Sequence, residues 1–261
     1  MTFATISSDV APSTSPGLWP HLPGLEVAAT YREPRIGGDF FDLVRSDRYV
    51  FLMMTDIAGD LDATQRIAAS VKEVFRQHTA SLIDQPVMNE PDAAVELLRV
   101  INGAIIAASG GVRCSPTFLA IYNLTLHVIT YISAGAPAAV AFNDGRIKIL
   151  ESTGIPLGLF THLTHDPMPL AVSENSRLVL VSKGVLERRR GKEEFGIQGV
   201  CDILKKNEAS SAEEISGQVL QAAENFGDPR PAHLPRPRLT FAALDATEGE
   251  QDMTVLTLAR D

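Results

Sequence analysis

The chain has little cysteine and no long hydrophobic run, and both absences limit what it can be. Its two cysteines, Cys114 and Cys201, lack the spacing of a zinc site and cannot build a disulfide framework. We therefore expect reduced thiols, as in the cytoplasm. No apolar run approaches the roughly 20 residues that span a bilayer. The N-terminus also lacks the basic region and apolar core of a secretory signal, so we expect a cytoplasmic protein without membrane contact.

An excess of basic residues is also missing. The formal net charge is −9, and 45% of the 261 residues are hydrophobic. A protein that binds nucleic acid regardless of sequence needs a basic face, so nucleic acid is not an expected partner. The length suits one large domain. Because residues 1–24 are rich in Ser, Pro and Thr without any period, we expect a flexible lead-in over 1–20 and a single domain over 21–261.

The hydrophobic pattern predicts strands that follow one another closely, interrupted by pairs of helices. The expected strands lie at 25–31, 40–44, 49–55, 117–123, 127–134, 138–143, 146–151, 177–182, 239–244 and 254–259, and the expected helices at 62–80, 92–109, 197–206 and 211–226. An alternating parallel fold would need a helix after each strand, and residues 117–151 have none. The order favours two mainly antiparallel sheets with helices outside them.

Two aspartates beside glycines mark a candidate site. Asp39 follows Gly37-Gly38, and Asp56 begins Asp56-Ile57-Ala58-Gly59. A hairpin of 40–44 with 49–54 would bring both carboxylates to one edge. Carboxylate oxygens are the ligands that Mg²⁺ and Mn²⁺ prefer. Taken alone, Gly37-Gly38-Asp39 is better explained as a tight turn.

Further motifs occur along the chain in a fixed order. They are Leu22-Pro23-Gly24-Leu25-Glu26-Val27-Ala28, Tyr31 to Pro34, Gly37 to Asp42, Asp56 to Gly59, Ser133-Ala134-Gly135-Ala136-Pro137, Gly154-Ile155-Pro156-Leu157-Gly158, Gly184-Val185-Leu186-Glu187, Glu194-Phe195-Gly196 and Asp252-Met253-Thr254. In this order the chain resembles the SpoIIE/RsbU branch of the PPM-type (protein phosphatase 2C-like) serine/threonine phosphatases, over about residues 18–260.

The resemblance implies an α+β fold, a four-layer α-β-β-α sandwich of two mainly antiparallel sheets flanked by helix pairs. It implies Mn²⁺ or Mg²⁺ as cofactor, held by Asp39, Asp56 and the carbonyl of Ile57. A metal-bound water, rather than a side chain, would attack phosphoserine or phosphothreonine. The implied partner is a phosphoprotein or signalling protein of the anti-sigma-factor-antagonist type.

The chain departs from the family pattern at this same site. The third acid of the family is replaced in Ser182-Lys183-Gly184, and an ammonium there would repel a dication. The fourth is replaced by Gln251, whose side-chain carbonyl can ligate a metal but without charge, next to Asp252. Adjacent residues of an extended chain point to opposite sides, so Asp252 would need a one-residue slip to serve as the ligand. Asp60 and Ala136 stand where the family has histidine.

These substitutions leave two functions open. The first is a phosphatase of this family with weakened or lost two-metal catalysis, which would use Mn²⁺ or Mg²⁺ if it is active. The second is a pseudophosphatase without metal that acts as a partner-binding regulatory module. Lys183 would pair with Asp39 or Asp56 and replace the missing cation, or it would be an ordinary exposed lysine.

Overall fold

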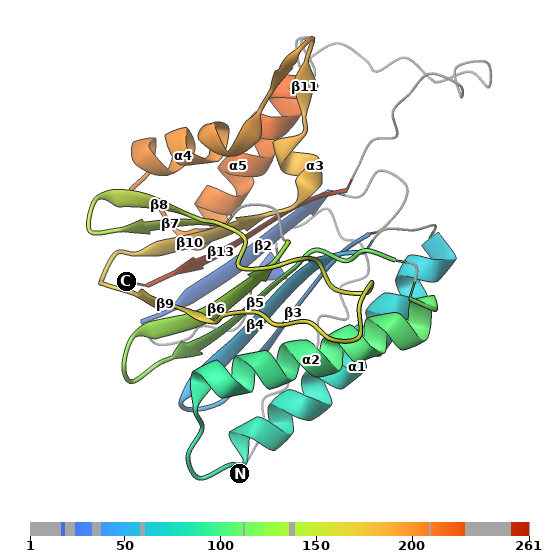
Figure 1. The fold of residues 1–261 in the computed structure, drawn as a ribbon. Coiled ribbons are helices and arrows are strands. Elements are labelled where there is room, and N and C mark those ends of the chain that lie inside the picture. Colours follow the sequence, from blue (N-terminus) through green and yellow to red (C-terminus); the bar gives the residue numbers. More distant parts are fainter. Residues whose placement is uncertain are drawn as a thin grey trace, which may run out of the picture.

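The computed structural model describes residues 17–18, 24–32, 38–57, 61–111, 113–135, 139–208, 210–227 and 252–260. The described elements form four layers, with helices on the outer faces of two stacked antiparallel sheets (Figure 1). The expected four-layer α-β-β-α sandwich is therefore confirmed. The expected strand at 239–244 and residues Asp60, Ala136 and Gln251 lie outside the described residues.

The first sheet has five strands in the order β3-β4-β5-β6-β9. Their bounds are β3 Asp39–Arg45, β4 Tyr49–Asp56, β5 Thr117–Asn123, β6 Val128–Ala134 and β9 Met168–Ala171. The helices α1 (Leu61–Ile83) and α2 (Glu90–Ser109) cover its outer face (Figure 1). All residues of β5 are buried, and in β4 only Asp56 is partly exposed. Both faces of these strands are covered, which explains their nearly continuous apolar sequence.

The second sheet has six strands in the order β1-β2-β13-β10-β7-β8. Their bounds are β1 Gly17–Leu18, β2 Glu26–Arg32, β7 Ala139–Asn143, β8 Arg146–Leu150, β10 Arg177–Val181 and β13 Met253–Ala259. The helices α3 (Lys183–Leu186), α4 (Gly196–Lys206) and α5 (Ala212–Gly227) lie on its outer side (Figure 1). A small hairpin pairs β11 (Arg189–Arg190) with β12 (Glu193–Glu194).

Three large hydrophobic clusters hold the layers together. The first lies between the sheets and contains Leu43, Leu52 and Leu256, with the rings of Phe118 and Tyr131 stacked at 5.5 Å. The second packs α1 and α2 on the first sheet through residues such as Phe75 and Ile101. The third packs α4 and α5 on the second sheet. Burial of apolar surface in all three interfaces is the main force that favours the fold.

Helix ends follow the local sequence signals. The expected capping box at the start of α5 is present, because Glu214 N donates to Ser211 Oγ at 3.1 Å and Ser211 N donates to Glu214 Oε2 at 3.0 Å. Asn89 caps α2 at its start, and Gly110 ends it with a left-handed φ of 68°. These local contacts fix where the helices begin and end relative to the sheets.

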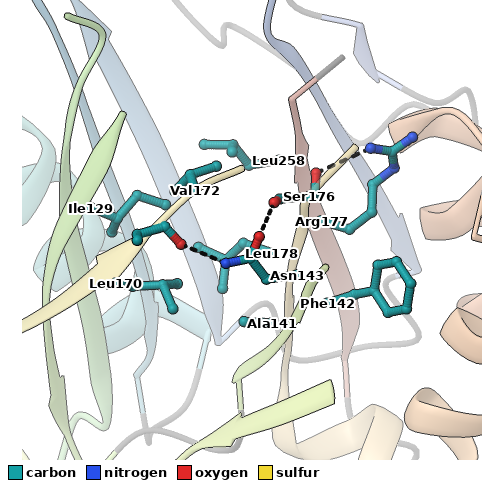
Figure 2. A pocket seen from close by; sticks show the side chains of 11 residues that line it. Ile129, Ala141, Phe142, Asn143, Leu170, Val172, Ser176, Arg177, Leu178 and Leu258 are labelled. Atoms are coloured by element: carbon teal, nitrogen blue, oxygen red, sulfur yellow. Dashed lines mark hydrogen bonds between the residues drawn. The ribbon is translucent and has the colours of Figure 1, made fainter. Parts of the chain in front are cut away.

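A polar latch joins the two sheets at one end of the sandwich. Asn143, at the end of β7, donates to the carbonyl of Ala171 at 2.9 Å and accepts from Ser176 Oγ at 2.5 Å (Figure 2). The small cavity beside it, about 10 Å³, is too small for more than one water. Ser176 precedes β10, whereas Ser182 follows it. The latch therefore lies at the opposite end of β10 from the candidate site.

Candidate metal centre

The β3–β4 hairpin places Asp39 directly opposite Asp56. They are register partners at the open end of the hairpin. Ile57 N donates to Gly38 O at 2.8 Å, and Asp56 N donates to Pro116 O at 2.9 Å, so both strand ends are fixed. A Cβ on Gly38 would lie 2.9 Å from the carbonyl oxygen of Ile57. Glycine is therefore required where the two strands come closest, which gives the Gly-Asp sequence a structural reason.

A third carboxylate, that of Asp252, reaches the same edge from the other sheet. Asp252 lies directly before β13, is 8% exposed, and accepts a hydrogen bond from Gly38 N through Oδ2. Its Oδ1 is buried and has no hydrogen-bond partner among the described residues. The side chain thus points toward the candidate site.

Burial raises the pKa of Asp39 to about 7. Hydrogen bonds from Thr254 and Ser182 oppose this shift, and the charges of Asp56 and Asp252 add to it. Thr254 Oγ1 donates to Asp39 Oδ2 at 2.7 Å. Asp39 is therefore a desolvated carboxylate that neighbouring acids disfavour as an anion. This arrangement calls for positive charge at the site.

Lys183 supplies part of that positive charge, but not through the expected ion pair. Burial raises the pKa of Asp56, the charge of Lys183 lowers it, and the charges of Asp252 and Glu187 raise it further. The half-exposed Lys183 Nζ lies 3.5 Å from Glu187 Oε1, so its ion-pair partner is one helical turn away. It acts on Asp56 over a longer distance. The expectation of a direct pair with Asp39 or Asp56 named the wrong partner.

The donor set has the chemistry of a hard-cation site but not its arrangement. Three carboxylates, one with an unpartnered buried oxygen, are suitable ligands for Mg²⁺ or Mn²⁺. However, Asp39 and Asp252 already accept hydrogen bonds from Thr254 and Gly38. Within the described ranges, no group of three or more His, Cys, Asp or Glu side chains is placed to hold a metal ion. The three carboxylates thus gather at one edge of the sandwich, but in this side-chain arrangement they do not converge on one point.

Sequence reasoning missed several residues at this edge. Ser182 and Thr254 hold each other across β10 and β13, because Thr254 N donates to Ser182 Oγ at 3.0 Å. Their signal is the small hydroxyl residue in each motif, Ser182-Lys183-Gly184 and Asp252-Met253-Thr254. Glu187, the partner of Lys183, belongs to the Gly184-Val185-Leu186-Glu187 motif, and its place four residues after Lys183 is the spacing of a helical ion pair. Burial, and then the charge of Asp56, raise the pKa of the nearby Cys114 thiol, which disfavours its reactive thiolate.

Residues 46–233, more than half of the chain, match the family of stage II sporulation protein E (SpoIIE). The chain belongs to the SpoIIE family. Among curated SpoIIE relatives, it is 24% identical to the phosphoserine phosphatase RsbP of Bacillus subtilis (strain 168) over 193 residues. That match covers 73% of this chain and 45% of RsbP. The chain spans about half the length of the curated relatives it matches.

Solved structures show the same fold. The RsbU and RsbW domains of a Mycobacterium tuberculosis protein superpose with a TM-score of 0.68 at 17% identity, over 91% of this chain and 61% of that one. RsbX in complex with magnesium gives a TM-score of 0.65 at 13% identity, over 95% of this chain and all of the other. Together with the family match, they identify a SpoIIE/RsbU-type PPM phosphatase fold. No helix in the described part of the chain is long and apolar enough to cross a membrane.

Proposed function

We propose that this chain is a signalling protein of the SpoIIE phosphatase family whose two-metal catalysis is weakened or lost. Its substrate would be a phosphoserine or phosphothreonine protein of the anti-sigma-factor-antagonist type. The observation that carries the proposal is Lys183, which stands where the family has an acid and whose charge acts on Asp56. A Mn²⁺ or Mg²⁺ pair would supply the activation of water. Asp39, Asp56, the Ile57 carbonyl and Asp252 are the described residues that would hold an ion.

The charge of Lys183 lowers the affinity of the site for a dication. Replacing an acid by an ammonium removes one attraction and adds one repulsion toward a dication. Lys183 is half-exposed and paired with Glu187, so solvent and this glutamate screen the repulsion to about 1 kcal/mol. A loss of that size weakens ion binding by about fivefold, and the missing carboxylate ligand adds to it. Binding of a second ion near Lys183 is therefore disfavoured.

The relatives support the choice of substrate class. RsbP is itself called a phosphoserine phosphatase, RsbX was solved with magnesium, and the M. tuberculosis structure joins an RsbU domain to an RsbW domain. They favour a metal-dependent phosphatase ancestry and a signalling-protein partner for this chain. Gln251 is neutral where the family has its fourth acid. Asp252 would supply a carboxylate in its stead, because the unpartnered Oδ1 of Asp252 lies at the edge of the site.

A second candidate function is a pseudophosphatase that binds its partner without hydrolysis. The hydrogen bonds that protein groups already donate to the acids favour this function. Thr254 Oγ1 donates to Asp39 and Gly38 N donates to Asp252, so protein groups already satisfy part of the charge that metal would otherwise balance. In this case the edge of the sandwich would serve as a docking face for the phosphoprotein.

Restoration of the missing acids tests the proposal. We would measure phosphate release from a phosphoserine protein of the anti-sigma-factor-antagonist class in about 1–5 mM Mn²⁺. The unmodified chain would be compared with Lys183→Asp/Gln251→Asp. The proposal predicts at least a hundredfold gain on restoration. Lys192→Asp makes the charge change of Lys183→Asp, two units, at an exposed position of the β11–β12 turn and serves as the control for that substitution. Robust turnover by the unmodified chain, unchanged on restoration, would contradict the proposal.

A further inference from the structure

Asp39 lies on an edge strand of its sheet. The strand β3 is at the sheet edge and pairs with β4 alone. Of its seven residues, only Asp42 and Leu43 are buried. Leu43 packs into the core between the sheets. On the helix-facing side, Phe40 and Val44 pack against the second hydrophobic cluster. The fully buried residue between them is Asp42, a charged residue in a position where an apolar one would be ordinary.

Arg76 of α1 binds this buried carboxylate with two hydrogen bonds. Its Nε lies 2.7 Å from Asp42 Oδ2, and its Nη2 lies 2.9 Å from Asp42 Oδ1. The carboxylate also accepts from Leu43 N at 3.0 Å. Asp42 is 1% exposed and the Arg76 side chain 20%. A bidentate arginine–carboxylate pair fixes direction as well as distance, so it sets where β3 lies along α1.

We propose that Arg76 and Asp42 are positioning residues for the candidate metal centre. Asp39 and Asp42 are three residues apart on a strand and so point to opposite faces. The pair therefore acts on Asp39 through the backbone of β3. The Arg76–Asp42 pair holds β3 together with the hydrogen bond that Ile57 N donates to the carbonyl of Gly38. With the pair in place, Asp39 stays opposite Asp56; without it, the free edge of β3 shifts or frays.

Replacing both partners separates positioning from stability. A buried carboxylate that loses its arginine is strongly destabilising, whereas an apolar replacement of both partners is often neutral. We would compare Arg76→Met, Asp42→Leu/Arg76→Met and the unmodified chain by thermal unfolding and amide hydrogen exchange. Ile57 N–H reports on the β3–β4 junction, and Leu256 N–H in β13 reports on the rest of the molecule. The double variant Glu96→Gln/Arg99→Gln removes an exposed bidentate pair on α2 as the control.

The expected results differ between the two readouts. Arg76→Met lowers the unfolding temperature by roughly 10 °C. The apolar double variant recovers most of that loss, yet its Ile57 amide exchanges at least tenfold faster than in the unmodified chain while Leu256 is unchanged. Unchanged Ile57 exchange in the stable double variant would overturn the proposal. If that variant does not fold, Asp42→Asn replaces it. The proposal is then contradicted if the ratio of the Ile57 to the Leu256 exchange rate is the same in Asp42→Asn as in the unmodified chain. Neither readout depends on catalysis or metal.

Discussion

Removal of the Asp39 charge should stabilise the metal-free protein at neutral pH. Burial raises the pKa of this carboxyl from 3.8 to about 7. A folded-state pKa above the unfolded value means that stability is greatest below pH 3.8. It is lost as the pH rises toward 7, because the unfolded chain releases the proton first. Above pH 7 the loss is complete. Asp39→Asn keeps an oxygen that can accept from Thr254 Oγ1 and removes the ionisation.

The size of the effect follows from the shift. A change of about 3 pKa units corresponds to about 4 kcal/mol, at 1.36 kcal/mol per unit. Asp39 retains some solvent exposure, so this figure is an upper bound. We expect Asp39→Asn to be about equal in stability to the unmodified chain near pH 4 and about 1–3 kcal/mol more stable at pH 7.5.

Urea unfolding in EDTA at a series of pH values from 4 to 8 measures this difference. Asp47→Asn removes an exposed carboxylate from the turn of the same hairpin and controls for net charge. The reasoning is refuted if the stability difference between Asp39→Asn and the unmodified chain is constant with pH or shrinks as the pH rises. Either result would mean that Asp39 is not a desolvated acid in the metal-free protein.

Four further substitutions, one of them a control, test contacts of the loops and helices. Asn102→Ala should cost about 1–3 kcal/mol in urea unfolding, because the Asn102 side chain bonds both Phe160 O and Gly158 N at 2.8 Å. Gly158→Ala should lower the free energy of unfolding by about 3 kcal/mol or more, since φ is +94° and the new Cβ would lie 2.1 Å from Arg113 O. The control Gly145→Ala, with φ of +71° and open space around the new Cβ, should lower it by only about 1 kcal/mol. Glu26→Gln should cost about 1 kcal/mol, because its carboxylate accepts from Ala212 N at the start of α5; a thermal melt without any shift would count against that contact.

Much of the fold could be predicted from local pattern. Continuous apolar runs identified β4, β5 and β10, and the Asn143-Asp144-Gly145 turn between β7 and β8 is a strong hairpin signal. The short strand β9 was missed because Met168–Ala171 contains a proline and is mostly exposed, as an edge strand allows. The helix at 183–186 was missed because four residues show no period.

The candidate site was predictable only in part. Asp39 and Asp56 could be paired from the sequence because a hairpin fixes its own register. The place of Asp252 could not, since it depends on how β13 enters the second sheet and on Gly38 across the sandwich. The partner of Asp42 was equally out of reach, because Arg76 is 34 residues away on a helix. Contacts between layers depend on tertiary packing, which no local pattern encodes.

The number of Mn²⁺ ions bound by the unmodified chain tests the central claim most directly. Native mass spectrometry, with equilibrium dialysis and elemental analysis as a check, gives this number at millimolar Mn²⁺. Since Lys183 stands in place of an acid, we predict at most one bound ion for the unmodified chain and two for Lys183→Asp/Gln251→Asp. Two tightly bound ions in the unmodified chain would contradict the account.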